Sequence, residues 1–110
     1  MSNITVKFTK MQLEEAQHKL CILRDEPDLQ ESYEVTAKEA AAVCDTFLKA
    51  QPGFVEFPHK FAEVIVGEFD NLLDIAEANL NTDENPMALR AYMGSLKQCM
   101  ARIKVAAGLE

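Results

Sequence analysis

The sequence predicts a mainly α-helical fold, a compact bundle of about four helices that forms a single helical domain over residues 1–110. Apolar residues recur at helical spacing over four segments. Two of these segments begin with a complete helix-start signature, and the other two follow a proline placed where a helix can begin. A chain of this length buries roughly two-thirds of its unfolded surface, which is enough for one hydrophobic core.

The N-terminal segment has a different pattern from the four predicted helices. Ile4, Val6 and Phe8 alternate with polar residues, and this alternation is the period of a half-buried strand. Val55 and Phe57 alternate in the same way after a Pro-Gly turn. Pairing of the two segments would add a short N-terminal β element to the bundle, and the sequence leaves open whether they pair.

The first helix is predicted over about residues 10–24. Thr9 is in position to cap this helix, Gln12 follows three residues later, and Phe8 and Leu13 occupy the two staple positions around the cap. The acidic segment that follows, "DEPDLQESYE", contains a proline and is predicted to be a solvated loop. The apolar face of the first helix comprises Leu13, Ala16, Leu20 and Leu23.

The second helix is predicted over about residues 37–50 and the third over about residues 59–80. Thr36 and Glu39 repeat the capping box before the second helix, and Pro58 is predicted to be the first helical residue of the third. The second helix is expected to bury Ala37, Ala40, Ala41, Cys44, Phe47 and Leu48. The third is expected to bury Phe61, Val64, Ile65, Phe69, Leu72, Leu73 and Ala76.

The third helix carries an acidic outer face. Residues 61–84 contain seven acidic residues and no lysine or arginine. On a helical wheel, four of their carboxylates cluster opposite the apolar stripe, namely those of Glu63, Asp70, Asp74 and Glu77. One interpretation is a solvated surface that is partly balanced by cations of the last helix. The other is an anionic docking face for a basic protein partner.

Glu68 differs from these four acidic residues, because it projects beside the apolar stripe of the third helix, near Phe61, Val64 and Leu72. A partly buried carboxylate needs a cation or hydrogen-bond donors. We expect Glu68 to be paired for structural reasons, with a cation of the last helix as the candidate partner, rather than to be a catalytic acid.

The last helix is predicted over about residues 86–107, with Asn85 as its cap and Pro86 as its first residue. Its inner stripe comprises Leu89, Met93, Leu96, Met100 and Ile103, and one flank carries a line of cations formed by Arg90, Lys97 and Lys104. A further side carries no charge, where a solvent-facing helix is normally charged. This uncharged side comprises Met87, Ala91, Gly94, Gln98, Ala101 and Val105.

Three interpretations of the uncharged side stay open. It is a small and weakly hydrophobic surface, or the N-terminal segment covers it, or a second molecule packs against it. A glycine in a helix interior costs about 1 kcal/mol relative to alanine. At Gly94, however, the lack of a side chain lets another backbone come close. Two-fold pairing is the commonest oligomer geometry, so self-association through this side predicts a homodimer.

Charge, cysteine content and hydropathy narrow the cellular compartments in which the protein is expected and the kinds of partner it is expected to bind. The net charge of −7 argues against broad nucleic-acid binding, which depends on lysine and arginine. The sequence has no Cys-x-x-Cys motif and an odd number of cysteines, so Cys21, Cys44 and Cys99 are expected to be reduced and mostly buried thiols. No apolar run reaches the length of a signal peptide or a membrane span, and we expect a cytoplasmic protein that does not contact a membrane.

The sequence contains no complete catalytic, cofactor-binding or metal-binding motif. Glu15 and His18 form a Glu-x-x-His element, but a di-iron bundle uses this element twice and adds two further glutamates. The oxygen-rich segment from Asn79 has Glu84 where an EF-hand needs glycine, and Arg90 where it needs its closing glutamate. Glycine-rich phosphate loops and local nucleophile–base sets are also lacking. We therefore expect no enzyme activity, no cofactor and no metal.

The function predicted from these observations is that of a non-catalytic protein-binding module: an adaptor, regulator or inhibitor. The module would act through the acidic face of the third helix and the apolar surface of the last. One alternative is a structural homo-oligomer without a different partner. Another is an acidic mimic of nucleic acid that inhibits a nucleic-acid-handling protein, because a field that repels DNA attracts the proteins that bind DNA.

Overall fold

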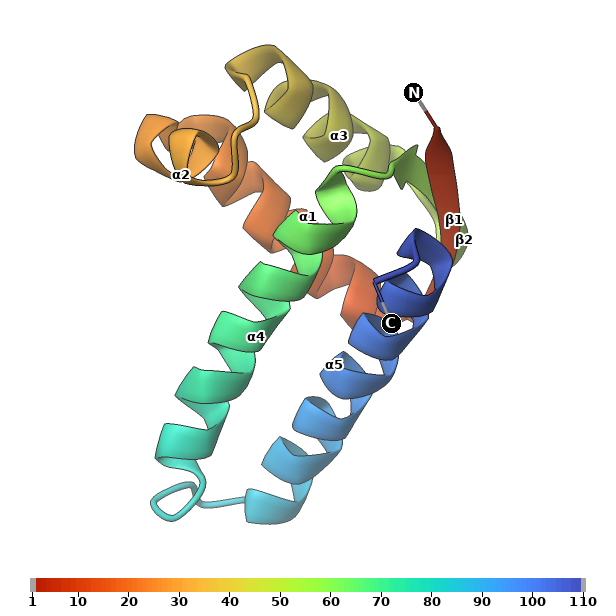
Figure 1. The fold of residues 1–110 in the computed structure, drawn as a ribbon. Coiled ribbons are helices and arrows are strands. Elements are labelled where there is room, and N and C mark those ends of the chain that lie inside the picture. Colours follow the sequence, from red (N-terminus) through yellow and green to blue (C-terminus); the bar gives the residue numbers. More distant parts are fainter. Residues whose placement is uncertain (1, 110) are drawn as a thin grey trace.

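The computed structural model describes residues 2–109 (Figure 1). Within this range the chain is mainly helical, with five helices and one two-stranded antiparallel sheet. None of the helices in the described range combines the length and the hydropathy that a membrane span requires. In chain order the elements are β1 (Asn3–Phe8), α1 (Lys10–Asp25), α2 (Pro27–Ser32), α3 (Ala37–Lys49), β2 (Gly53–Pro58), α4 (Phe61–Asn79) and α5 (Pro86–Ala107).

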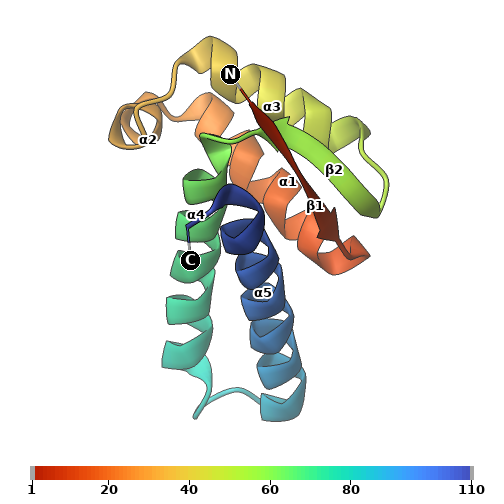
Figure 2. The same cartoon turned by 45° about the vertical axis from the view of Figure 1, so that its right-hand side comes forward.

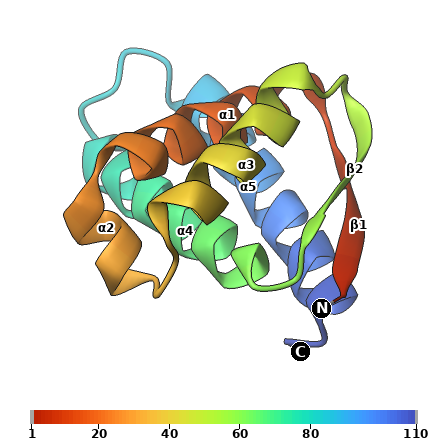
Figure 3. The same cartoon turned by 90° about the horizontal axis from the view of Figure 1, so that it is seen from above.

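The elements form a body from which one helical hairpin extends. In the body α1 and α3 pack side by side (Figure 3), and the sheet contacts α5 through β1 and α3 through β2. The helices α4 and α5 run antiparallel to each other, and their distal ends project away from α2, α3 and the sheet (Figures 1 and 2). The molecule is therefore elongated, with principal extents of 43, 28 and 27 Å.

The two alternating segments, whose pairing the sequence left open, form a small sheet. The strands β1 and β2 pair antiparallel, with Ile4 opposite Phe57 and Val6 opposite Val55. Two inward residues of the sheet, Phe8 of β1 and Phe57 of β2, pack against Phe47 of α3. The ring centroids of Phe8 and Phe47 lie 5.4 Å apart, those of Phe47 and Phe57 5.4 Å, and those of Phe8 and Phe57 6.1 Å. This aromatic cluster holds the sheet to the helical body.

The predicted capping signatures are confirmed. The side chain of Thr9 accepts a hydrogen bond from the backbone N–H of Gln12, and Thr36 does the same for Glu39, with the reciprocal bond present in both boxes. Asn85 caps α5 by accepting a hydrogen bond from the backbone N–H of Ala88 at 3.2 Å. As a result α5 has the predicted bounds, and α1 and α3 differ from the predicted bounds by one residue at their ends.

The prediction of a solvated loop after the first helix is wrong, because Pro27–Ser32 forms the helix α2. Pro27 occupies the first turn, where a missing N–H group costs nothing. The side chain of Gln30 is buried, and its Nε2 atom donates to the carbonyls of Leu23 and Arg24 at 2.9 Å each. Carbonyls at a helix end lack helical partners, so Gln30 satisfies the end of α1 and fixes α2 beside it.

The prediction that Pro58 begins the third helix is also wrong. Pro58 is the last residue of β2, and α4 begins at Phe61. Pro58 lies opposite Asn3 in the sheet, and the next residue, His59, donates its backbone N–H to the carbonyl of Ser2 at 3.1 Å. Pairing with β1 therefore keeps this segment extended, and proline is tolerated at a strand end.

The apolar face of α3 is rotated from the predicted one. Val43 is buried although it was not in the predicted set, whereas Ala37 and Ala41 are exposed and Leu48 is 50 % exposed. The run of alanines explains the error, since alanine is accommodated on either side of a helix and leaves the apolar period weak. The buried residues of α3 are Ala40, Val43, Cys44 and Phe47.

The predicted stripes of α4 and α5 are buried with two exceptions. Leu72 on α4 and Leu89 on α5 are only partly buried. Both lie in the half of the hairpin that is distal to the body. The exceptions therefore mark the place where the hydrophobic core of the hairpin ends.

A buried glutamine joins the start of α1 to α5, and Arg102 of α5 extends this network to β1. Gln12 is 0 % exposed, and its Oε1 atom accepts from the backbone N–H of Thr9 at 2.9 Å and from Nη1 of Arg102 at 3.0 Å. Its Nε2 atom donates to the carbonyl and the hydroxyl of Ser95 at 2.8 and 3.0 Å. Arg102 also donates to the carbonyl of Lys7 at 3.2 Å. The side chain of Gln12 thus satisfies polar groups at the start of α1 and on α5.

Candidate functional site

The distal half of the α4–α5 hairpin contains a cleft of about 590 Å³. Both helices contribute apolar side chains to it, and the end of α4 and the following loop contribute polar and acidic ones. The apolar lining comprises Leu72, Ile75, Ala76, Leu89 and Tyr92, and the polar lining comprises Asn79, Thr82, Asp83 and Glu84. A cleft of this composition suits a ligand with an apolar centre and a basic or hydrogen-bonding end.

Within residues 2–109, no third element covers the hairpin at this end (Figure 1), so the cleft is open to solvent. No residue from 77 to 92 is buried, although this stretch includes the last turn of α4 and the first two turns of α5. Apolar side chains in and next to this stretch are consequently in contact with solvent: Ile75, just before it, is 58 % exposed, and Met87, within it, is 78 % exposed. The tip of the hairpin therefore presents an exposed apolar surface to solvent.

Tyr92 forms a fixed wall of the cleft. Its hydroxyl donates a hydrogen bond to Oε2 of Glu15 on α1 at 3.1 Å. Burial, together with the nearby Glu15 carboxylate, raises the pKa of Tyr92 to about 12. The phenol therefore stays neutral at physiological pH, and it is held against the body rather than being free to move into the cleft.

The four carboxylates of the predicted acidic face, Glu63, Asp70, Asp74 and Glu77, are all exposed on α4. Among residues 2–109, none of the four forms an ion pair within 4.0 Å, and neither do the predicted α5 cations Arg90, Lys97 and Lys104. Direct balancing by α5 is therefore not seen in the described chain. At the loop, the acidic Asp83 and Glu84 continue this negative surface into the cleft lining.

The uncharged side of α5 faces outward. Met87, Ala91, Gln98, Ala101 and Val105 are exposed, and a Cβ atom placed on Gly94 would have no neighbour within 4 Å. The strand β1 lies beside the C-terminal half of α5 without covering this side. A shallow hollow of about 420 Å³ separates them there, lined by Thr5, Val6, Lys7, Phe54, Ala101, Arg102, Val105 and Ala106.

The comparisons with known proteins assign no family. No protein-family model, no curated protein and no solved structure matches the chain.

Glu68 has a structural partner, but this partner is not the expected cation of the last helix. Glu68 is 5 % exposed, and its Oε2 atom accepts from the hydroxyl of Tyr33 at 2.8 Å and from Nδ2 of Asn71 at 3.4 Å. The tyrosine approaches closely because residue 67 is glycine, where a Cβ atom would lie 2.6 Å from the Tyr33 hydroxyl oxygen. Burial and the Glu68 carboxylate raise the pKa of Tyr33 above its ordinary value, so the tyrosine remains a donor.

Two surfaces of the hairpin follow from the sequence, whereas the cleft between its helices does not. Ile75 was the available signal, because it is a large apolar residue outside the predicted inner stripe of its helix. Periodicity alone does not show that Ile75 and Leu89 line the same cleft. In the described residues, no group of three histidine, cysteine, aspartate or glutamate side chains is placed to hold a metal ion.

Proposed function

We propose that the chain is a non-catalytic protein-binding module, an adaptor, regulator or inhibitor that works in the cytoplasm. Its α4–α5 hairpin binds a basic, amphipathic helix of a partner protein in the cleft. The observation that carries this proposal is the unfinished core of the hairpin: residues 77–92 include no buried residue, yet they border an apolar cleft of about 590 Å³. Apolar side chains of a partner would complete this core.

The apolar lining supports a helix as the occupant. An amphipathic helix presents anchors at positions i, i+3 or i+4 and i+7 along one face, and such a face fits the groove between two helices. Covering apolar surface contributes roughly 25 cal/mol per Å², and a few large anchors carry most of the affinity at protein interfaces. Ile75, Leu89 and Tyr92 are the residues of the cleft that would contact such anchors.

The charges support a basic partner. Glu77 and Asp74 lie on the outer face of α4 without an ion pair in the described chain, and Asp83 and Glu84 lie in the cleft lining. Unpaired carboxylates attract lysine and arginine over several ångströms, which speeds association and favours basic partners over acidic ones. A protein that normally binds nucleic acid carries such a basic surface, so inhibition by mimicry is a special case of this proposal.

The replacement of Ile75 by asparagine tests the apolar contact. Because Ile75 is 58 % exposed, Ile75→Asn should leave the fold unchanged. The loss of a buried apolar anchor is worth about 1.5–3 kcal/mol, so partner binding should weaken by more than about tenfold. Affinity capture with the wild type and the variant, quantified by mass spectrometry, measures this difference for each bound protein.

Two comparisons make this test specific. Leu48→Asn removes a similarly exposed leucine from α3, at 50 % exposure, and should change nothing. Asp74→Asn combined with Glu77→Gln should weaken the same partner and reduce the dependence of binding on salt, whereas Glu26→Gln combined with Glu31→Gln should not. A protein held equally by all variants is not a ligand of this cleft, and the proposal fails if every captured protein behaves in that way.

Self-association is the second candidate function, and the exposed uncharged side of α5 favours it. This side runs from Met87 to Val105, which are 78 % and 71 % exposed, over about 27 Å of helix. Two-fold pairing of this side with a second copy would make the protein a homodimer. The two functions are compatible, because the cleft and this side of α5 are lined by different residues.

Gly94→Lys tests the homodimer. A side chain at this position meets open space in the single chain, and lysine is a better helix former than glycine by about 0.7 kcal/mol, so the variant should fold. Sedimentation should show a dimer for the wild type and a monomer for Gly94→Lys. Ala41→Lys, which changes an exposed residue of α3, should remain dimeric. A monomeric wild type, or a dimeric Gly94→Lys variant, contradicts self-association through α5.

A further inference from the structure

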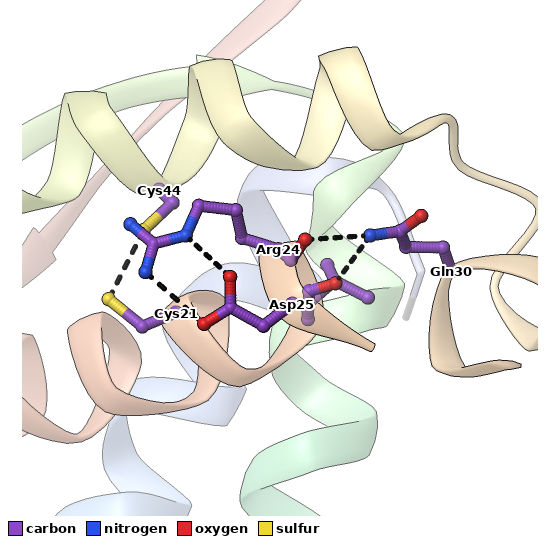
Figure 4. Close-up of polar contacts among 6 residues, drawn as sticks. Cys21, Arg24, Asp25, Gln30 and Cys44 are labelled. Atoms are coloured by element: carbon purple, nitrogen blue, oxygen red, sulfur yellow. Dashed lines mark hydrogen bonds and ion pairs between the residues drawn. The ribbon is translucent and has the colours of Figure 1, made fainter. Parts of the chain in front are cut away.

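Two cysteines from different helices lie in contact inside the body (Figure 4). Cys21 on α1 and Cys44 on α3 are 23 residues apart in sequence, and their Sγ atoms are 3.2 Å apart. A disulfide bond requires about 2.05 Å between the sulfurs, a value that small side-chain rotations reach from this distance. The packing of α1 against α3 therefore places the two sulfurs in contact, close to bonding distance.

The two thiols differ in their access to solvent. Cys44 is fully buried at 0 % exposure, whereas Cys21 is partly exposed. A small oxidant therefore reaches the sulfur of Cys21 first. The buried Cys44 contacts the sulfur of Cys21 on the side facing the protein interior. It is therefore placed as the resolving cysteine, the thiol that attacks an oxidised Cys21.

An arginine lies at the same place. Nη1 of Arg24 is 3.7 Å from Sγ of Cys44, and the guanidinium is held by Asp25 through contacts of 3.1 and 3.3 Å (Figure 4). Burial raises the pKa of Cys44 to about 11, and the positive charge of Arg24 acts in the opposite direction. Cys44 is therefore a thiol at neutral pH, with a cation placed to stabilise its thiolate when the proton leaves.

We infer that Cys21 and Cys44 form an oxidisable dithiol site, at which a hydroperoxide converts the two thiols into an intramolecular disulfide that joins α1 to α3. This inference does not depend on the proposed binding function. It assigns a covalent modification to a part of the molecule that is separate from the hairpin cleft.

The reaction balances with the hydroperoxide as the only oxidant. The Cys21 thiol loses its proton, and its sulfur attacks the peroxide oxygen; the O–O bond breaks, an alcohol or water leaves, and Cys21 becomes a sulfenic acid. Cys44 then loses its proton to solvent and attacks the Cys21 sulfur, so that the S–S bond forms and the hydroxyl group leaves as water. Two electrons pass from the dithiol to the peroxide.

Cys99 provides an internal reference. It lies on α5, it is buried, and burial raises its pKa to about 12. Low exposure and little thiolate make a cysteine unreactive. Oxidation at the proposed site should therefore leave Cys99 as a free thiol.

The test treats the full chain with hydrogen peroxide at about one equivalent and follows the products by mass spectrometry. The mass should fall by two hydrogen atoms, the number of titratable thiols should drop from three to one, and peptide mapping should find Cys21 joined to Cys44. Dithiothreitol should reverse the change. The thermal midpoint of the oxidised form should rise by roughly 10 °C, because the bond closes a loop in the unfolded chain.

Variants separate this site from nonspecific oxidation. Cys99→Ser should form the disulfide as the wild type does, whereas Cys21→Ser and Cys44→Ala, each checked for helical content, should not form it. An irreversible sulfinic acid on Cys21, a bond between chains as the main product, or a bond to Cys99 would each overturn the inference. Because Cys21 is partly exposed, its serine variant should fold even if the Cys44 variant does not.

Discussion

Phe47→Ala is expected to lower the free energy of unfolding by about 3–5 kcal/mol. Phe47 is 0 % exposed, and its ring contacts the rings of Phe8 and Phe57 with centroids 5.4 Å away in both cases. The substitution removes a buried ring, leaves a cavity, and loses two aromatic contacts worth about 0.5–1.5 kcal/mol each beyond their area. A domain of this size has a stability of about 5–15 kcal/mol, so the variant should lose a large fraction of its stability.

Urea unfolding followed by circular dichroism measures this effect. Leu48→Ala is the matched control, since it truncates the neighbouring apolar residue, which is 50 % exposed, and its cost should stay below about 1 kcal/mol. Equal midpoints for Phe47→Ala and Leu48→Ala would show that the sheet does not depend on the aromatic cluster.

Gln12→Leu is expected to cost about 2–4 kcal/mol, although leucine is nearly the same size and more apolar. The substitution leaves the backbone N–H of Thr9 and the guanidinium of Arg102 without the acceptor that lies at 2.9 and 3.0 Å from them. A buried donor that loses its partner costs about 1–3 kcal/mol, and more when it carries a charge. The capping box of α1 is lost with it, which adds about 1 kcal/mol.

A graded series checks the Gln12 prediction by the same unfolding measurement. Gln12→Glu keeps an acceptor for Thr9 and Arg102 but loses the donor to the carbonyl of Ser95 at 2.8 Å, so its stability should lie between those of the wild type and Gln12→Leu. Gln51→Leu, at an exposed loop position, should be neutral. A Gln12→Leu variant as stable as the wild type would mean that water or rearranged side chains replace the lost bonds.

The parts of the fold that depend on local chemistry were predictable from the sequence. Thr9 and Thr36 each cap the helix that they precede, and Asn85 with Pro86 sets the start of α5. These signals act within four residues, so they need no knowledge of the rest of the chain. Alternating apolar residues likewise indicated both strands, because one face of the sheet is buried, but they left open whether the strands pair.

The errors concern residues whose role is decided by distant parts of the chain. Pro27 begins a helix and Pro58 ends a strand, although both are prolines near the start of a helical segment. The difference comes from their partners, since Gln30 of α2 binds the end of α1 while β1 holds Pro58 in the sheet. Neither partner is identifiable from spacing within a short segment.

The candidate sites were predictable only in part, for the same reason. The carboxylates of α4 and the uncharged side of α5 follow from a helical wheel for each helix separately. The cleft needs Ile75 and Leu89 to lie on one side of a hairpin, and the dithiol needs α1 to pack on α3 so that Cys21 meets Cys44. Both depend on contacts between elements, which the periodicity of one segment does not contain.

The pairing of β1 with β2 affects the order in which the chain can fold. During synthesis, residues 3–8 emerge early and have no strand to pair with until residues 53–58 have followed. The hydrogen bond from Arg102 to the carbonyl of Lys7 forms later still, since these residues are 95 positions apart in the sequence. Long-range closure of this kind slows folding relative to a bundle with only neighbouring contacts. Completion of the fold described for residues 2–109 is thus postponed until α5 leaves the ribosome, and products that lack α5 should remain open to chaperones and proteases.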